Sequence, residues 1–254
     1  MKVSDFYDFL DKWAPFRTML PYDNAGLLVG SPDCEVSGVM LCLDITSDVI
    51  NGAREQGCDL IISHHPVIFD PLKALPCAAP AYMLAHEGMS AICAHTNLDA
   101  ASGGVNDMLA KALGLSDVTP LAHPETPNLP PLARMGSLPK EMSVSGLAKY
   151  AGEKLGCSGV RFTGNDEKIT RVALCGGGGM GFCEVAAASG AQALITGECK
   201  YSDALAAKIP VIDCGHFCTE NVIVNELKSR LCEAFPNMKI VAATQGDIFN
   251  YITR

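Results

Sequence analysis

The chain has 254 residues, of which 48% are hydrophobic and 19% charged, and its net charge is −9 at pH 7. This length and composition allow a sizeable core and exclude a disordered protein. The apolar runs are too short to cross a bilayer, and charged residues stand where a signal peptide needs an apolar stretch. We therefore expect a cytoplasmic protein with no membrane partner, and the acidic balance argues against nucleic acid.

The sequence predicts alternating helices and strands. The first helix is expected at residues 4–13, with Ser4 as its N-cap. The elements expected next are a strand, a helix and two further strands, at residues 39–43, 47–56, 60–62 and 91–94. Short buried strands that alternate with helices indicate an α/β fold with mixed, mainly parallel sheets, in three layers.

The second half of the chain repeats the pattern of the first. Val39-Met-Leu-Cys42 resembles Val172-Ala-Leu-Cys175, and residues 57–63 resemble residues 190–196, both at a separation of 133 residues. A third match, His95-x-x-x-Asp99 with His216-x-x-x-Glu220, follows in the same order, which favours duplication.

We predict two similar α/β repeats, residues 1–125 and 126–254. The stretch at about 120–139 is rich in proline, a composition typical of a linker.

Histidines follow the predicted strands. His64 and His65 come directly after the strand at 60–62, and the carboxyl ends of parallel strands open into the ligand crevice of such sheets. Taken alone, this pair is slightly better explained by one core or capping histidine beside one exposed histidine.

His95 and His216 each stand at a strand end, with a carboxylate four residues later, Asp99 or Glu220, where the next helix is expected to start. Helix N-capping is the simpler explanation for each carboxylate by itself. The concentration of histidines at equivalent strand ends favours a metal site instead. Imidazole and carboxylate groups are ligands suited to Zn, Fe, Mn, Co or Ni.

Five ligands are too many for one four-coordinate ion. We therefore predict two divalent metal ions per chain, about 3.5–4 Å apart, a spacing suited to activating water against a polar bond. The predicted ligands are His64, His65, Asp99, His216 and Glu220, and the predicted proton-transfer residue is His95.

Twelve cysteines are scattered along the chain, and none forms a C-x-x-C pair. In a reducing compartment they are most simply buried free thiols, so a four-cysteine zinc site is not expected. Cys214 and Cys218 flank His216 and are candidate metal ligands, although we expect both to pack in the core rather than to bind metal.

The run Gly176–Gly179 follows a predicted strand and fits both a dinucleotide fingerprint and a flexible anion-accepting loop, of which we favour the loop. After the next strand, Glu198 is placed to orient a ligand histidine and Lys200 to meet a phosphate.

Together these motifs resemble the dinuclear-metal family known as GTP cyclohydrolase 1 type 2, or Nif-three-like. The matching segments span nearly the whole chain: Tyr22-Asp-Asn-Ala-Gly-Leu27, Ser63-His-His-Pro66, Ala94-His-Thr-Asn-Leu-Asp99, Gly103-Gly-Val-Asn106, Thr196-Gly-Glu198 and Gly215-His-Phe-Cys-Thr-Glu220. Tyr22, Gln192 and Ser202 stand where the family usually has Trp, Asp and His.

The resemblance implies two intertwined α/β repeats, a metal pair between them with the five predicted ligands, and a toroidal homohexamer. It points to a metal-dependent hydrolase that acts on a small molecule, a nucleotide such as GTP, by water attack on the purine imidazole ring. The alternative function is a non-catalytic metal-binding or regulatory scaffold.

Overall fold

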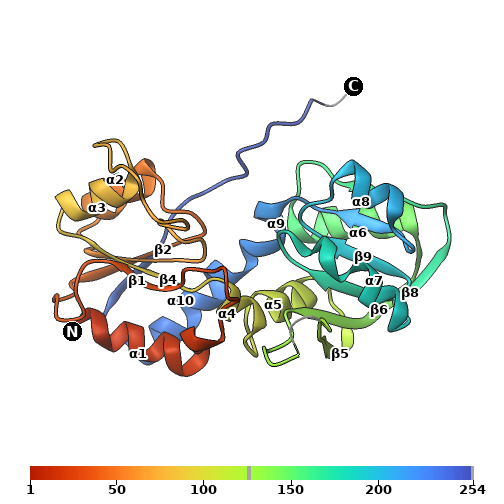
Figure 1. Cartoon of the computed structure of the whole chain (residues 1–254), viewed down its shortest axis with the longest axis horizontal. Coiled ribbons are helices and arrows are strands. Elements are labelled where there is room, and N and C mark those ends of the chain that lie inside the picture. Colours follow the sequence, from red (N-terminus) through yellow and green to blue (C-terminus); the bar gives the residue numbers. More distant parts are fainter. Residues whose placement is uncertain (125–126, 253–254) are drawn as a thin grey trace. The chain divides into compact units, whose positions relative to one another are not determined.

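The computed structural model describes residues 1–124 and 127–252 and divides into two compact units (Figure 1). Unit 1 consists of Met1–Ser102 and Ile223–Gln245, and unit 2 consists of Gly103–Val222 with the C-terminal segment from Gly246. Each unit contains one mixed β-sheet with helices, which confirms the predicted α/β class. Within the described residues, no helix is both long and apolar enough to cross a membrane.

Unit 1 is built on a five-stranded sheet in the order β1-β4-β3-β2-β11. All neighbouring pairs are parallel except β1 with β4. The strands are β1 (Gly26–Val29), β2 (Gly38–Cys42), β3 (Leu60–Ser63), β4 (Ser90–Cys93) and β11 (Lys239–Ala242). Every residue of β2, β3 and β4 is buried, as expected for parallel strands covered on both faces.

Helices cover both faces of this sheet, with α2 and α3 on one side and α1 and α10 on the other (Figure 1). They are α1 (Val3–Trp13), α2 (Ser47–Glu55), α3 (Pro80–His86) and α10 (Val222–Ala234), with two short helices, η1 (Phe16–Thr18) and α4 (Thr96–Ala100). The first helix starts one residue earlier than predicted, because Lys2 is the N-cap and its backbone N–H donates to Asp5 at 2.8 Å.

Unit 2 is built on a six-stranded sheet in the order β5-β6-β8-β9-β10-β7. The three strands β8, β9 and β10 are parallel to one another, and the flanking pairings are antiparallel. The strands are β5 (Ser116–Leu121), β6 (Ala133–Ser143), β7 (Arg161–Phe162), β8 (Lys168–Cys175), β9 (Ala193–Thr196) and β10 (Val211–Asp213).

Residues of β8 alternate between two cores, because successive side chains of a strand point to opposite faces. Val172 and Leu174 pack with residues of two longer helices, α5 (Val105–Ala112) and α6 (Val144–Leu155). Ala173 and Cys175 pack on the opposite side, with residues of η2 and α7. The remaining helices are η2 (Gly179–Phe182), α7 (Cys183–Ala188), α8 (Tyr201–Ala206) and α9 (His216–Glu220).

The two units share one strand–helix–strand arrangement, as the sequence match predicts. In unit 1 the parallel pair β2 and β3 aligns Val39 with Leu60, and in unit 2 the parallel pair β8 and β9 aligns Val172 with Ala193. Both residues of the second pair lie 133 positions after their counterparts, so the pairing register itself is repeated. This agreement supports duplication of an ancestral unit.

The predicted repeat boundary between residues 125 and 126 lies outside the described residues. The compact units follow a different division, because residues 223–245 return to unit 1, where β11 pairs with β2. The two repeats are intertwined because a segment of the second repeat completes the sheet of unit 1.

The predicted linker at 120–139 is wrong for its two ends, which belong to strands β5 and β6. Pro120 lies on β5 at the edge of the sheet, and Pro139 lies where the register between β6 and β8 shifts. Both are positions where a strand tolerates proline, since edge strands and bulges need not donate every backbone N–H.

The return of α10 to unit 1 yields a stability prediction. Leu231 is fully buried on this helix, whereas Ser229 is exposed. We expect Leu231→Ala to lower the free energy of unfolding by about 2–5 kcal/mol, and Ser229→Ala by no more than about 0.5 kcal/mol. Urea denaturation followed by circular dichroism measures both. Equal effects of the two substitutions would contradict the docking of this helix.

Candidate metal centre

Three histidines of unit 1 lie at the carboxyl ends of two adjacent parallel strands. His64 and His65 follow β3, and His95 follows β4, one residue beyond Ala94. The two strands end level with each other, because Ser63 pairs with Cys93. The ligand nitrogens of the three imidazoles all lie within 4.8 Å of one another, a grouping that can hold a metal ion.

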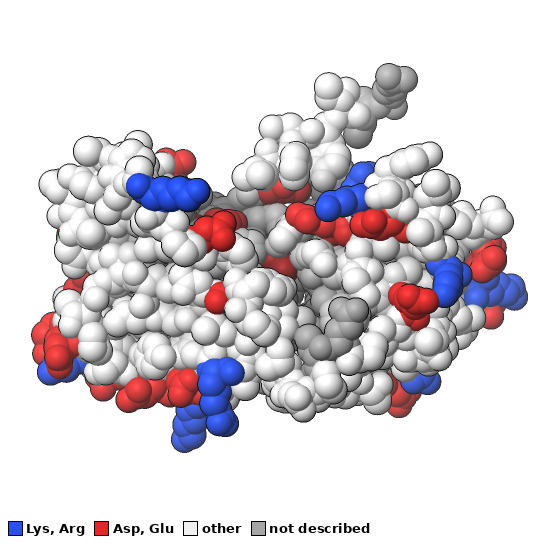
Figure 2. Space-filling view, viewed as in Figure 1, with Lys and Arg blue, Asp and Glu red and all other residues white. Residues whose placement is uncertain are grey.

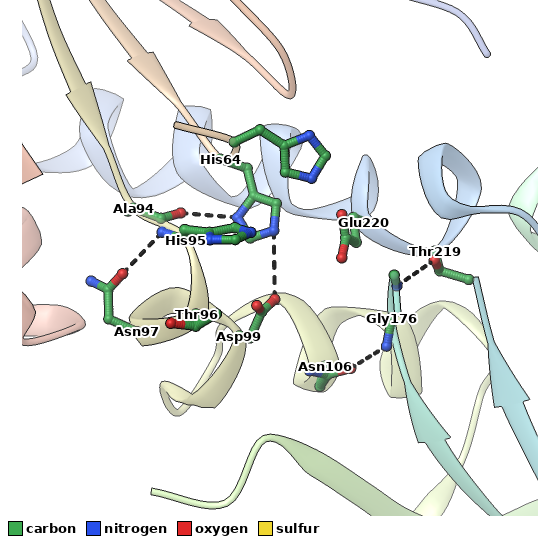
Figure 3. A network of polar contacts seen from close by, with 12 residues as sticks. His64, Ala94, His95, Thr96, Asn97, Asp99, Asn106, Gly176, Thr219 and Glu220 are labelled. Atoms are coloured by element: carbon green, nitrogen blue, oxygen red, sulfur yellow. Dashed lines mark hydrogen bonds and ion pairs between the residues drawn. The ribbon is translucent and has the colours of Figure 1, made fainter. Parts of the chain in front are cut away.

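His64 is fully buried, and both of its nitrogens face oxygen atoms (Figure 3). Its Nδ1 lies 2.9 Å from the carbonyl oxygen of Ala94, and its Nε2 lies 3.5 Å from Oδ1 of Asp99. A carbonyl only accepts, so Nδ1 must carry the hydrogen and Nε2 of a neutral ring must carry the lone pair. His64 therefore presents a nitrogen lone pair beside the carboxylate of Asp99, and both could serve as metal ligands.

His65 and His95 are oriented in the same way, but by carboxylates. Nδ1 of His65 donates to Oδ1 of Asp44 at 2.7 Å, and Nδ1 of His95 donates to Oδ1 of Asp23 at 2.7 Å. Such contacts fix the tautomer and the ring plane of a metal-binding or proton-transferring histidine.

Asp23 accepts additional hydrogen bonds from the backbone and the hydroxyl of Thr96. Burial by itself raises the pKa of this carboxyl, but the hydrogen bonds from His95 and Thr96 outweigh burial and hold the pKa at about 2. Asp23 is therefore an ionised partner for His95 at neutral pH.

Unit 2 contains a second group of candidate ligands around His216, which opens α9 after strand β10. Nδ1 of His216 lies 2.8 Å from Oε1 of Glu198, and Nε2 lies 2.8 Å from Oε2 of Glu220. Glu220 is buried, whereas Glu198 is largely exposed. The prediction that Glu198 orients a ligand histidine agrees with this contact.

The sequence pattern suggested that Asp99 and Glu220 stand where a helix starts, but neither residue starts a helix. Helix α4 starts at Thr96 with His95 as its N-cap, and α9 starts at His216 with Gly215 as its N-cap. Asp99 is the fourth residue of the five-residue α4 and still lies in its first turn, and Glu220 is the last residue of the five-residue α9. Neither carboxylate is therefore the N-cap of its helix.

The glycine run before η2 is not a loop open to anions. The backbone N–H groups of Gly176, Gly177 and Gly179 donate to the side chains of Asn106, Thr219 and Thr196, at 2.8, 3.1 and 3.1 Å. Figure 3 shows the first of these contacts, which comes from α5. Amides committed in this way do not cradle a phosphate.

Gly177 is required because its backbone passes against the His216–Glu220 pair. Its φ is +55°, and a Cβ placed on it would lie 2.1 Å from Oε1 of Glu220 and 3.0 Å from Nε2 of His216. Only glycine leaves this space to the ligand side chains. The glycine run thus shapes the candidate centre rather than binding a substrate.

These features define a mixed α/β protein whose strand ends carry oriented histidines and carboxylates suited to divalent metal ions. The chain belongs to the Duf34/NIF3 (NGG1p interacting factor 3) family, whose model matches residues 1–246.

Known relatives agree with this membership along the whole chain. A Clostridium acetobutylicum protein named GTP cyclohydrolase 1 type 2 homolog is 31% identical over 99% of this chain and 98% of its own length. The crystal structure of a Staphylococcus aureus hypothetical protein is 32% identical, with a TM-score of 0.92 over 99% of both chains. A Bacillus cereus protein related to NIF3, 23% identical, shares the fold with a TM-score of 0.91 over 99% of both chains.

The close approach of Gly177 to the ligand pair yields a prediction with a matched control. Gly177→Ala forces the end of the Glu220 side chain to move, so we expect metal affinity to fall roughly 10–100-fold while the protein still folds. Gly178→Ala meets nothing within 4 Å and should bind metal normally. Titration with a divalent metal and a chromophoric chelator measures both. Equal affinities would contradict the role of Gly177.

Proposed function

We propose that this chain is a dinuclear divalent-metal-dependent hydrolase. His64, His65 and Asp99 of unit 1 and His216 and Glu220 of unit 2 hold the two ions jointly in this proposal. The observation that carries it is the orientation of the histidines, each of which has its Nδ1 against an oxygen of its own unit.

The His216 contacts are compatible with a bound metal ion. This imidazole lies between two carboxylates, Glu198 at Nδ1 and Glu220 at Nε2. A neutral ring donates from only one nitrogen, so the lone pair of the other would face a carboxylate oxygen at 2.8 Å. That arrangement is favourable when imidazole and carboxylate serve as ligands of the same cation.

A bound pair of divalent cations would supply a water of lowered pKa, about 7, and polarisation of the bond to be hydrolysed. The chain supplies the remaining groups. Asp44, Glu198 and the carbonyl of Ala94 keep the ligand imidazoles in place. His95, held by ionised Asp23, is the candidate proton-transfer group.

A nucleotide is the proposed substrate class, and the reaction is water attack on the imidazole ring of GTP. This substrate and this reaction follow from the names of the relatives and are the most specific part of the proposal. On the face that Figure 2 shows, Lys and Arg side chains are interspersed with Asp and Glu side chains rather than gathered into a stripe. That distribution and the net charge of −9 favour a small substrate over a nucleic acid.

A homohexamer is part of the same proposal. Helix α8 buries none of its residues, and it exposes two large apolar side chains, Tyr201 at 84% and Leu205 at 77%. Apolar groups exposed to this degree on one short helix are typical of a surface that other copies of the chain cover.

Metal content tests the ligand assignment. Purified protein loaded with Zn, Fe, Mn, Co or Ni should retain about two ions per chain, as a two-metal centre requires. Glu220→Gln and His64→Ala should each reduce this to about one or fewer, whereas Glu184→Gln, at an exposed carboxylate of α7, should not change it. Elemental analysis measures the content. Full metal content in both ligand variants would rule out the assignment.

Formate release from GTP tests the reaction. Metal-loaded wild-type protein should release formate, and His95→Ala should lower the rate by roughly 10²–10⁴-fold, the usual contribution of a general acid–base group. If no formate is released with any of the metals, the proposed cyclohydrolase activity is wrong and the scaffold function is favoured. An undiminished rate in His95→Ala would remove only the proton-transfer role of His95.

A further inference from the structure

Gln245 extends the pairing of β11 with β2 by means of its side chain. One residue beyond β11, the backbone N–H of Ala243 donates to the carbonyl of Leu41 at 2.8 Å. Two residues further on, Oε1 of Gln245 accepts from the N–H of Leu43 at 2.8 Å, and its Nε2 donates to the carbonyl of Asp44 at 2.9 Å. These partners fix the orientation of the amide, because an N–H only donates and a carbonyl only accepts.

The backbone that Gln245 holds is also the backbone that orients His65. The N–H of His65 donates to the carbonyl of Leu43 at 2.9 Å, and Nδ1 of His65 donates to Oδ1 of Asp44 at 2.7 Å. Leu43 and Asp44 are therefore bonded both to Gln245 and to His65, with two hydrogen bonds to each. All four residues belong to unit 1.

Burial and exposure explain why this backbone needs Gln245. Leu43 is 1% exposed, so solvent does not readily replace the amide oxygen as the acceptor of its N–H. The side chain of Asp44, by contrast, is 48% exposed, and water competes for its carboxylate. Its contact with His65 is lasting only if the backbone of Asp44 is fixed, and the amide of Gln245 supplies that fixation.

Asp23, the carboxylate that orients His95, is held differently. Its side chain is closed to solvent and accepts two hydrogen bonds from Thr96. Asp23 is thus fixed through its own carboxylate, whereas Asp44 is fixed through its backbone by a residue 201 positions away.

We propose that Gln245 is a positioning residue for His65. Through the backbone of Leu43 and Asp44, it keeps the hydrogen of His65 on Nδ1 and the lone pair on Nε2, the atom that would bind a cation. The consequence for metal binding rests on the proposed function, whereas the effect on the imidazole does not.

The tautomer of His65 tests the proposal in protein from which all metal has been removed. Correlation of the ring protons with the ring nitrogens by NMR, at a pH where the imidazoles are neutral, distinguishes a hydrogen on Nδ1 from one on Nε2. Wild type should show only the Nδ1–H form of His65. Gln245→Ala should give a mixture of both forms, while His64, which donates to the carbonyl of Ala94, should not change. A single Nδ1–H form in the variant would overturn the proposal.

Gln192 in unit 2 provides a matched control. Its Oε1 accepts from the N–H of Arg171 at 3.0 Å, and its Nε2 donates to the carbonyl of Lys168 at 3.2 Å. Gln192→Ala removes a contact of the same kind, so it should lower the midpoint of urea unfolding as Gln245→Ala does, but leave His65 in one tautomer. A mixture in both variants would show a general loosening of the fold and would overturn the proposal.

A double variant tests the route through Asp44. Asp44→Ala removes the acceptor of Nδ1 and should give a mixture for His65 by itself. Adding Gln245→Ala should then change His65 no further, because two residues that act on the same contact are not additive. A further change would overturn this route. If Gln245→Ala does not fold, Gln245→Asn replaces it, since an amide one methylene group shorter does not reach both partners.

Metal affinity is measured separately, by titration of zinc against a chromophoric chelator. Gln245→Ala should weaken the binding of one ion roughly 10-fold, as expected when a residue that holds a ligand in place is lost, and Gln192→Ala should bind as wild type does. Unchanged affinity despite a mixed tautomer would overturn the coupling of Gln245 to the centre. If wild type bound no zinc, the metal-centre proposal would fail, while the tautomer result would still stand.

Discussion

Hydrogen bonds at Nδ1 decide what the histidines of this protein can do. Each of the four imidazoles near the strand ends donates from Nδ1 to an oxygen of its own unit, at 2.7 to 2.9 Å. An imidazole held in this way has a fixed ring plane and presents Nε2 as its ligand atom. Without these acceptors, the same histidines could rotate or exchange tautomers, and a metal centre would lose the preorganisation on which tight binding depends.

The duplicated sheets explain how such groups come together. Parallel strands that end level with each other bring the residues after them to one edge, and in both units these residues include the candidate metal ligands. The two copies have diverged in what they supply, however. Unit 1 has histidines after both β3 and β4, whereas unit 2 has Glu198 after β9 and a histidine only after β10. The two units thus share the same strand register, but the candidate ligands after the strands differ between them.

Much of this frame is readable from sequence because it is local. Buried strands such as β3 can be predicted from their continuous apolar residues, and His64 and His65 directly follow this strand. The partners Asp23 and Asp44 are not readable in this way, because each comes from a loop 72 or 21 residues away from the histidine it orients. Spacing along the chain carries no signal for such a contact.

Two composition-based interpretations did not hold, and each has a physical cause. Prolines at 120 and 139 suggested a linker, but an edge strand and a shifted register accommodate proline within a sheet. Four consecutive glycines suggested a flexible anion loop, but side chains of Asn106, Thr196 and Thr219 hold three of those amides. Glycine here provides room for Glu220 rather than mobility.

Anomalous X-ray diffraction from crystals of metal-loaded protein, collected at the absorption edge of the bound metal, is the most direct measurement of the proposed centre. Two anomalous peaks about 3.5–4 Å apart are expected, with ligands from both His64 of unit 1 and His216 of unit 2. A single peak bound by residues of one unit alone, or peaks away from all five proposed ligands, would contradict a dinuclear centre shared by the two units.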